Sequence, residues 1–478
     1  MSFSQLPNEI KRKIFSNLEQ KERQALRHVD SNWKAIIDDM TKWKDKCSMN
    51  EIKPWKNQLI KLQYPSLKSA NYKHLKEKEL KKIFLLYRKW RKTIDAGRIY
   101  LNDFENFPAE FPRSLNFEDI ECSFDLLAGY IAVGITRIGL NWLYKIDEGI
   151  HLSHAFYFDD HIDRNVGLDR GIKIPISLDF IEVKLWITGT GKLIYVVCFR
   201  DQLLFWDVEK KTKIPTPSSI FLQDSLNSIN IRRGTDEYFY IINNSTKTMH
   251  IIRLDYVGNE ITTKKLLIIR YHSFEFLKFI DFHAEEKKIM VVYELLGIKS
   301  NTLLTTIVKI PRSQVLPVKI SAYDRTHTAR FSYMRNANQE YDFTIPCINV
   351  VIAVNKYPFF SARTFIVQIS RFDERNRHLT TLKRYEIPES IIPNDTEIQF
   401  MTIYFNYLFL GTEKAELTIF KLKNLQHLKY LNFDNLEKKV VRTEIFTKLL
   451  KITKYNNQII MLLANRKEVK LLTCNLNF

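Results

Sequence analysis

The apolar positions of this chain change their spacing near residue 100. Before that point they recur every three or four residues, as on amphipathic helices, and beyond it they alternate in short runs rich in Val, Ile, Phe, Tyr and Thr. Ile10, Ile14 and Leu18 mark a first helix. A second follows from about Glu22, and a third begins after Asp30, a good N-cap. We therefore predict a helical first fifth and an all-β remainder.

A basic helical spacer is predicted over residues 47–100, after a small helical module at residues 1–46. Its apolar residues recur at three and four positions and define one packed face: Leu80, Ile83, Phe84, Tyr87 and Trp90. Lysines occupy much of the remaining surface: Lys76, Lys78, Lys81, Lys82, Lys89 and Lys92. The pattern predicts a spacer helix with one buried side and one solvated side.

Beyond residue 110, one pattern recurs: a strand-like run, a short polar turn and a second alternating strand. Seven passages carry it: 130–146, 193–208, 238–254, 289–310, 348–369, 407–422 and 459–474. Their second strands follow one another at about 45 to 65 residues, close to the blade length of repeat propellers. We predict that residues 110–478 close into a β-propeller, with seven blades as the expected number. A pair of β-sandwiches is the competing fold.

The first three helices are too short to bury all their apolar surface among themselves, so some of it should face a partner. The string Leu6-Pro7-x-x-Ile10-x-x-x-Ile14-Phe15-Ser16-x-Leu18, followed by Leu26-Arg27-x-Val29-x-x-x-Trp33, resembles the F-box. It departs from the family at Asp30-Ser31-Asn32, where Cys-Arg often precedes the Trp, and at Glu22-Arg23, where an acidic-Leu pair often opens the second helix. The alternative is a three-helix cap whose apolar stripes meet only each other.

The F-box resemblance implies a partner and a function. F-box segments pack against a Skp-type adaptor, which holds the cullin scaffold and the catalytic ring-finger subunits. The implied adaptor-binding residues are Leu6, Pro7, Ile10, Ile14, Phe15, Leu18, Leu26, Val29 and Trp33. Within this set the resemblance places Leu26, Val29 and Trp33 in the helical core or at its edge.

Two further passages resemble F-box proteins that carry WD repeats. Residues 87–92, followed by Ala96-Gly97-Arg98, are similar to the passage that links the F-box to the propeller. Residues 205–208 and 411–420 resemble the strand-turn-strand centre of a WD repeat. Trp206-Asp207 alone keeps the dipeptide literally, and the usual Gly-His pairs are absent, so we expect a degenerate propeller.

Composition narrows the class of protein. The five cysteines, Cys47, Cys122, Cys198, Cys347 and Cys474, show no metal-ligand spacing and are typical of buried thiols. With no signal profile and no apolar run long enough for a membrane span, we expect a cytoplasmic or nuclear protein that does not engage a membrane.

The net charge is +19, and residues 42–92 hold about 16 basic residues against about four acidic ones. This charge favours polyanions such as nucleic acid, although a solvated helical face is the simpler interpretation.

The chain offers few candidates for chemistry of its own. Gly189-Thr190-Gly191-Lys192 lacks the spacing of a Walker motif and is predicted to be a hairpin turn. Asp159-Asp160-His161 with Asp163 could converge on a cation, but such a cluster is more often a solvated loop. No serine stands in a nucleophile elbow, and no cysteine has local support for a lowered pKa. We expect no catalytic residues, no bound metal and no cofactor.

Protein substrates are expected at the loops of the propeller rims. The long connections at about 149–176 and 312–345 are the candidates. Arg325, Arg330 and Arg335 in the second would suit a phosphorylated segment, since guanidinium groups bind phosphate bidentately. The leading hypothesis is the non-catalytic substrate receptor of a Skp–cullin–F-box ubiquitin ligase, which marks proteins for degradation. The alternatives are a basic nucleic-acid-binding protein and a scaffold that binds the adaptor but no cullin.

Overall fold

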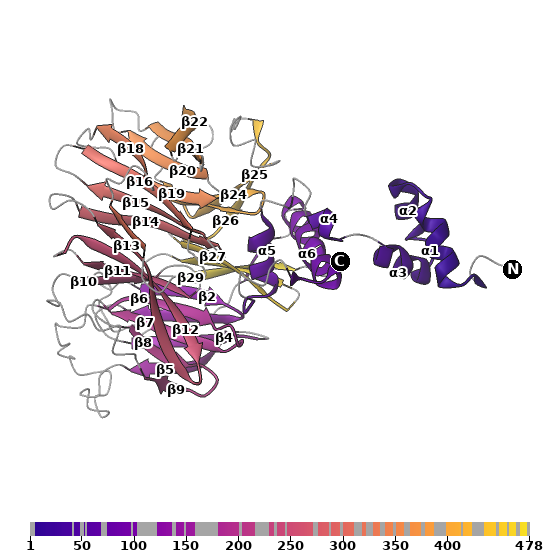
Figure 1. Ribbon diagram of the computed structural model, residues 1–478, viewed down its shortest axis with the longest axis horizontal. Coiled ribbons are helices and arrows are strands. Elements are labelled where there is room, and N and C mark those ends of the chain that lie inside the picture. Colours follow the sequence, from indigo (N-terminus) through magenta and orange to yellow (C-terminus); the bar gives the residue numbers. More distant parts are fainter. Residues whose placement is uncertain are drawn as a thin grey trace.

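A computed structural model describes most of the regular elements of the chain (Figure 1). The described residues are 5–40, 43–47, 52, 55–67, 74–96, 99–102, 122–135, 140–147, 150–157, 180–199, 203–215, 229–233, 237–243, 246–270, 276–285, 288–296, 300–309, 318–321, 328–334, 340–347, 350–357, 364–373, 378–386, 398–412, 414–422, 435–445, 449–456, 458–464 and 469–475.

All helices of the described part lie before the first strand. They are α1 (Asn8–Ser16), α2 (Gln20–Leu26), α3 (Ser31–Met40), α4 (Trp43–Cys47), α5 (Lys56–Gln63) and α6 (Glu77–Asp95). The second helix, expected from about Glu22, begins at Gln20 and ends at Leu26, and Pro7 occupies the N-cap of α1. No helix among the described residues is long and apolar enough to cross a membrane.

From Tyr100 onward the regular elements of the described chain are strands, which form seven sheets. The first sheet contains β2 (Cys122–Leu127), β3 (Tyr130–Ile135), β4 (Leu140–Ile146) and β5 (Ile150–Tyr157). The second sheet contains β6 (Phe180–Ile187), β7 (Leu193–Phe199), β8 (Leu203–Asp207) and β9 (Thr212–Ile214). The third sheet contains β10 (Ile229–Arg233), β11 (Tyr238–Asn243), β12 (Thr248–Val257), β13 (Glu260–Arg270) and β17 (Val318–Ser321).

Sheets four to seven continue in chain order, except that the seventh sheet also contains the first strand of the chain. The fourth sheet contains β14 (Phe276–Glu285), β15 (Lys288–Leu296), β16 (Ser300–Lys309) and β18 (Thr328–Met334), and the fifth contains β19 (Glu340–Cys347), β20 (Val350–Tyr357), β21 (Thr364–Asp373) and β22 (His378–Glu386). The sixth sheet contains β23 (Ile398–Tyr404), β24 (Tyr407–Thr412), β25 (Glu416–Lys421) and β26 (Lys438–Arg442). The seventh sheet contains β27 (Leu449–Tyr455), β28 (Gln458–Ala464), β29 (Val469–Asn475) and β1 (Tyr100–Asn102).

The prediction of N-terminal helices followed by mostly β structure is confirmed. Each of the seven predicted hairpins is the second and third strand of a different sheet, paired antiparallel. Runs of apolar residues locate these central strands, because both strand faces are buried in the sheets whose side chains are described. The outer strands carry a weaker pattern, and the hairpin period alone does not reveal them.

Apolar cores lie between successive sheets. Among the described side chains, one core joins sheets one and two, a second joins two and three, and a third joins seven and one. The first strands of neighbouring sheets also contact one another, as β2 does with both β6 and β27. Sheets from the two ends of the β-rich part are therefore packed together, and we call the whole the β body.

A tight turn in the first sheet shows how closely two sheets approach. Ala128 and Gly129 connect β2 to β3, and both have positive φ, as in a type I′ hairpin turn. A Cβ on Gly129 would lie 2.4 Å from the Tyr455 ring of the seventh sheet. Only glycine therefore fits at this position while Tyr455 keeps its place.

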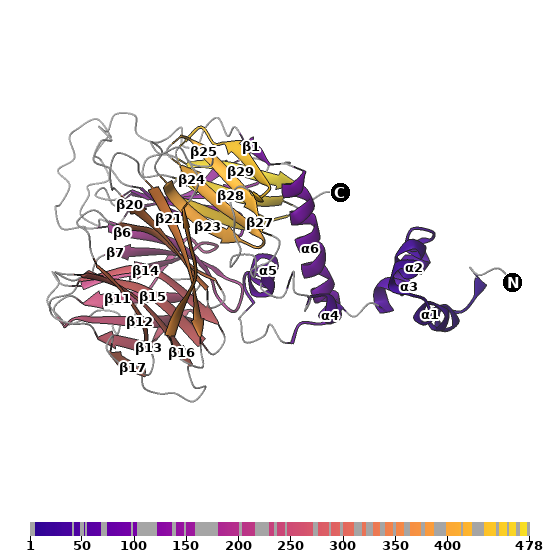
Figure 2. The same cartoon turned by 90° about the horizontal axis from the view of Figure 1, so that it is seen from above.

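The seventh sheet joins distant parts of the chain. Its outer strand β1 pairs antiparallel with β29, with Tyr100 opposite Thr473 and Asn102 opposite Leu471. Because β1 follows directly after the helical part, this pairing ties that part to the last sheet. Figures 1 and 2 show α5 and α6 against the β body, while α1 to α3 project beyond them toward the N-terminus.

Candidate adaptor-docking site and its attachment to the β body

The first three helices pack around a small apolar core. Phe15, Ile36 and Ile37 are its buried members, and Leu18, Leu26, Trp33 and Met40 pack against them while partly exposed. The rings of Phe15 and Trp33 are 5.9 Å apart between centroids. Phe15 is 0% exposed, so in this conformation it offers no surface to a partner and instead holds α1 against α3.

Other predicted adaptor-binding residues remain at the surface of this helical trio. Ile10 is 45% exposed and Val29 is 65% exposed, so both present apolar area to a potential partner. Pro7 is also exposed, and Leu6 and Ile14 are half-buried. The structure thus separates the predicted set into a core and an exposed apolar surface. Whether an adaptor covers that surface stays a prediction.

Capping residues fix the turns between these helices. Asp30 Oδ1 accepts hydrogen bonds from the backbone N–H groups of Asn32 (2.7 Å) and Trp33 (3.1 Å), which confirms its predicted role as the N-cap of α3. At the start of α2, the Glu22 carboxylate accepts a 2.7 Å hydrogen bond from the backbone N–H of Glu19. These caps define where each helix begins and keep the trio compact.

Asp38 of α3 connects the trio to the spacer helix. Its Oδ2 accepts a 2.7 Å hydrogen bond from Lys81 Nζ of α6. Its Oδ1 lies 2.6 Å from Arg27 Nη2 as an ion pair whose geometry falls short of a hydrogen bond. The Asp38 side chain is only 9% exposed, so water screens these contacts less than it would at an open surface. One carboxylate therefore links α2, α3 and α6.

Trp43 adds to the same junction. Its indole N–H donates to the Asp38 carbonyl oxygen (3.1 Å), and its backbone N–H donates to Glu77 Oε2 (2.6 Å). Its ring meets Phe84 of α6 at a centroid distance of 5.4 Å, and Lys81 Nζ lies 5.7 Å from the ring centroid. The junction thus combines charge, hydrogen bonds and apolar packing.

The apolar face of α6 packs on the β body. Its predicted residues Leu80, Ile83, Tyr87 and Trp90 are buried as expected, with Phe84 partly buried. They share one core with residues of the sixth and seventh sheets. Trp90 is 0% exposed and lies 5.3, 6.1 and 6.4 Å, between ring centroids, from Phe405, Tyr407 and Phe409. The helix is therefore an integral part of the folded β body.

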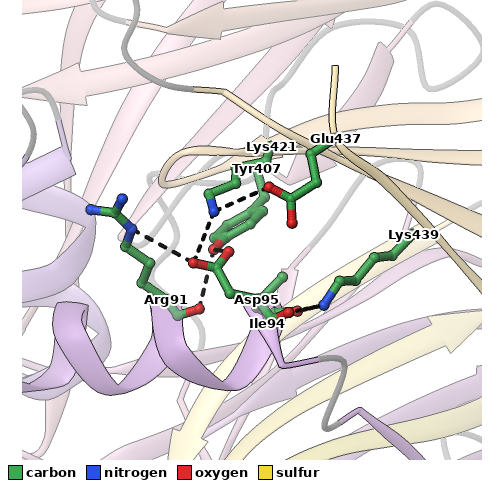
Figure 3. A network of polar contacts seen from close by, with 7 residues as sticks. All are labelled: Arg91, Ile94, Asp95, Tyr407, Lys421, Glu437 and Lys439. Atoms are coloured by element: carbon green, nitrogen blue, oxygen red, sulfur yellow. Dashed lines mark hydrogen bonds and ion pairs between the residues drawn. The ribbon is translucent and has the colours of Figure 1, made fainter. Parts of the chain in front are cut away.

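A polar network holds the C-terminal end of α6 on the sixth sheet (Figure 3). Asp95 accepts a 2.7 Å hydrogen bond from the Tyr407 hydroxyl and lies 2.9 Å from Lys421 Nζ and 3.8 Å from Arg91 Nε. Burial and the Asp95 carboxylate raise the pKa of Tyr407, so its hydroxyl stays a donor at all ordinary pH values. Lys439 Nζ donates to the last carbonyl oxygens of the helix, at Ile94 and Asp95. Its charge also suits the negative end of the helix dipole.

The predicted turn at Gly189–Lys192 is a hairpin turn between β6 and β7. Gly191 has a φ of +89° and donates its N–H to the Thr188 carbonyl oxygen. Lys192 Nζ hydrogen-bonds Tyr256 Oη at 3.3 Å and Asn259 Oδ1 at 3.1 Å, so the lysine joins two sheets. The turn lines a cleft of about 180 Å³ that also touches Leu67 and Tyr256.

Of the remaining sequence candidates, Asp207 is a structural residue in a turn, and the side chains of the others lie outside the described residues. Asp207 of the WD-like dipeptide accepts 3.0 Å hydrogen bonds from the N–H groups of Glu209 and Lys210 and so closes the turn before β9. Arg325 and Arg335 lie outside the described residues, as do the cluster at 159–163 and the side chain of Arg330. Within the described chain, no group of three His, Cys, Asp or Glu side chains could hold a metal ion.

Sequence reasoning missed Asp38 and Asp95, the residues that attach the helices to each other and to the β body. Asp95 and Tyr407 are 312 positions apart, and Asp38 and Lys81 are 43 apart. No local pattern marks such pairs. The one signal available was their placement: each is an acidic residue near the C-terminal end of an amphipathic helix.

Comparisons with solved structures return proteins of low sequence identity. The β-propeller domain of Cps50 (Swd1) from Myceliophteria thermophila is 7% identical, with a TM-score of 0.42, over 74% of this chain and 96% of that one. Hsv2 from Kluyveromyces lactis is 10% identical, with a TM-score of 0.38, over 74% and 92%. The Nup133 β-propeller domain from Vanderwaltozyma polyspora is 10% identical, with a TM-score of 0.40, over 72% and 91%. No curated protein matches the chain in sequence.

The family comparison concerns the N-terminal helices. The model of the F-box domain matches residues 3–45, which span α1, α2 and α3 and reach into α4. The matched range contains the buried Phe15 and the exposed Ile10 and Val29. Residues 3–45 of this chain are an F-box domain.

Proposed function

We propose that this protein is the substrate receptor of a Skp–cullin–F-box ubiquitin ligase. The F-box at residues 3–45 carries the proposal, because F-box domains in general bind Skp-type adaptors. The exposed Pro7, Ile10 and Val29 supply apolar surface for such a partner. Burial of these side chains would contribute favourable free energy on docking, at about 25 cal/mol per Å² of apolar area.

The β body is the proposed substrate-binding part. We interpret its seven sheets as the blades of a degenerate β-propeller, whose ring is closed by the pairing of β1 with β29. Apolar cores between sheets one and two, two and three, and seven and one support this interpretation. Loops at the rims of such a ring would select the protein to be ubiquitinated. Arg325, Arg330 and Arg335 stay the candidates for a phosphorylated segment.

The proposed role is not catalytic. Ubiquitin transfer would occur on other subunits, reached through the adaptor and the cullin in the cytoplasm or the nucleus. The receptor would accelerate transfer by holding the substrate near the catalytic subunit, since proximity raises the effective concentration of the reacting groups.

Adaptor binding tests the proposal directly. The variant Leu6→Ser, Pro7→Ser, Ile10→Glu changes the surface end of α1 while leaving Phe15 and its core intact. We expect co-purification with a Skp-type adaptor to be lost, with an affinity at least about a hundredfold weaker, because a charge would be desolvated in the contact. Unaltered affinity with a folded variant would remove the proposal.

A matched control uses equally exposed apolar residues far from the F-box. Val257 is 65% exposed and Val440 is 50% exposed, both on the β body. The variant Val257→Glu, Val440→Glu should bind the adaptor as the unchanged chain does. Adding a cullin to the adaptor complex then separates a ligase receptor from a scaffold. A complex that excludes the cullin would favour the scaffold.

A further inference from the structure

The outer face of α6 is strongly basic. The helix buries Leu80, Ile83, Leu86, Tyr87, Trp90, Thr93 and Ile94. On the opposite side, positions spaced by three and four residues are exposed or half-exposed, and with the exception of Leu85 they are cationic: Lys78, Lys82, Arg88, Lys89 and Lys92. From Lys78 to Lys92 the helix rises about 21 Å, at 1.5 Å per residue. The cations therefore form one continuous stripe.

The β body extends this stripe. Lys454 of β27 lies near Lys82 and Lys89, and its pKa is lowered by burial and by the positive charges of these two lysines. We call Lys78, Lys82, Arg88, Lys89, Lys92 and Lys454 together the basic stripe. Figure 2 shows α6 along the flank of the β body beside β27 and β29.

The stripe is not neutralised by the described part of the chain. Between Lys81 and Ile94, α6 contains no acidic residue. At its N-terminal end, Glu77 and Glu79 accept backbone hydrogen bonds from Trp43 and Lys76. At its C-terminal end, Asp95 is engaged by Tyr407 and Lys421. Among the described residues, Lys82, Lys89 and Lys92 have no carboxylate partner. Like charges held together in this way repel one another, and an anionic ligand that binds them would relieve the repulsion.

We propose that the basic stripe binds the phosphodiester backbone of a nucleic acid, as a second interaction surface distinct from the F-box and from the substrate-binding loops. The stripe spans the length of about six phosphates of one strand, at 3.4 Å each, and carries a comparable number of cations. Lysines dominate it, and a lysine ammonium contacts a phosphate as a point charge without fixed geometry. Such contacts bind the backbone without reading the base sequence.

The packing of α6 argues against a membrane surface. A helix that lies in a lipid interface inserts its apolar face, but the apolar face of α6 is already buried against the sixth and seventh sheets. Only Leu85, which is 36% exposed, offers apolar area on the outer side. Only electrostatic attraction is left to hold a ligand on this side of the helix, and a continuous phosphate backbone offers negative charge along the whole stripe.

Salt-dependent binding tests the proposal on the full-length chain. A fluorescent DNA duplex of about 20 base pairs and a single-stranded RNA of about 20 nucleotides are titrated between about 50 and 200 mM salt. With about six phosphate contacts, the duplex affinity should fall about a thousandfold across this range, with a slope near −5 in a plot of log K against log salt. The slope should be near −4 for the single-stranded RNA. Whichever of the two nucleic acids binds more tightly identifies the ligand as duplex DNA or as single-stranded RNA.

Two triple variants locate the site. Lys82→Gln, Lys89→Gln, Lys92→Gln should reduce the duplex slope by about three units and the affinity at low salt at least about tenfold. Lys210→Gln, Lys213→Gln, Lys265→Gln removes the same charge from exposed positions on sheets two and three and should change the slope much less. The proposal is overturned by equal effects of the two triples, by no binding at about 50 mM salt, or by stripe-dependent binding to phosphatidylserine vesicles but not to either nucleic acid.

Discussion

At the scale of single residues, Trp90 is the contact that makes the helical spacer part of the β body. Its ring is fully buried among three aromatic rings of the sixth sheet. Its indole N–H has no hydrogen-bond partner among the described atoms, although it is buried. The residue therefore contributes through packing, since its one polar group adds no hydrogen bond there.

Truncation of this side chain should destabilise the fold strongly. Trp90→Ala should lower the free energy of unfolding by about 3–5 kcal/mol, because it leaves a cavity between α6 and the sixth sheet. Trp90→Phe should cost much less, since it keeps an aromatic ring and removes an unpaired buried N–H. Urea unfolding followed by circular dichroism measures both. Leu85→Ala, at an exposed position of the same helix, is the control, and an equal loss there would contradict the assignment.

Burial also sets the chemistry of the thiols. Cys47 and Cys474 are buried, and burial raises the pKa of Cys47 to about 11 and that of Cys474 to about 12. A thiol with a raised pKa keeps its proton in the folded state, while the unfolded chain loses it above about pH 9. The stability that these thiols contribute is therefore fully present below pH 9 and is lost as the pH rises through 11 to 12.

Alkylation measures this effect. At pH 8, iodoacetamide should modify Cys47 and Cys474 in the folded chain at least about a hundredfold more slowly than in the unfolded chain, because only the thiolate reacts. Peptide mass spectrometry distinguishes the individual cysteines, and the chain in urea is the reference. Rapid modification of Cys47 in the folded chain would show that α4 separates from α6 in solution.

At the scale of elements, α6 has two faces with different tasks. Its apolar face completes the core of the sixth and seventh sheets, and its outer face carries the basic stripe. Both ends are held by carboxylates, Asp38 near the N-terminal end and Asp95 at the C-terminal end. The helix is thus a rigid connection between the F-box and the β body, although it was expected only as a spacer.

Truncation separates these elements. A chain that begins at residue 43 loses the F-box but keeps α4 to α6, so it should stay soluble with nearly unchanged thermal stability. A chain that begins at residue 99 exposes Phe405, Tyr407 and Phe409 and should aggregate, because a large apolar patch is uncovered. Size-exclusion chromatography and thermal melts compare the two. A soluble and equally stable shorter chain would mean that α6 is not part of the core.

At the scale of the whole molecule, local pattern predicted the repeated elements well. The seven hairpins were found because their strands carry apolar residues on both faces, as Ile194 and Tyr195 or Ile459 and Ile460 do. The first three helices were found because the apolar residues recur at helical spacing and Asp30 caps the third helix. These features are encoded within about twenty neighbouring residues, where periodicity is readable.

Long-range pairings were not readable in the same way. The pairing of Tyr100 with Thr473 and the contact of Asp95 with Tyr407 each join residues more than three hundred positions apart. The placement of Phe15 in the core depends on how α1 faces α3, which a single amphipathic stripe does not determine. Periodicity shows that a face is buried, but it does not identify the element that covers it.

The position of the F-box relative to the β body should depend on Asp38. Asp38→Ala removes the only carboxylate that joins α2, α3 and α6 among the described contacts. We expect the F-box to keep its own fold and its adaptor affinity, while its orientation becomes variable. Fluorophores on unnatural amino acids at the exposed positions 28 and 210 report this as a broader distance distribution in single-molecule energy transfer. Asp147→Asn, which breaks an exposed ion pair with Lys145 on the β body, should leave the distribution unchanged. If Asp38→Ala also leaves it unchanged, the apolar contact of Trp43 with Phe84 suffices to hold the junction.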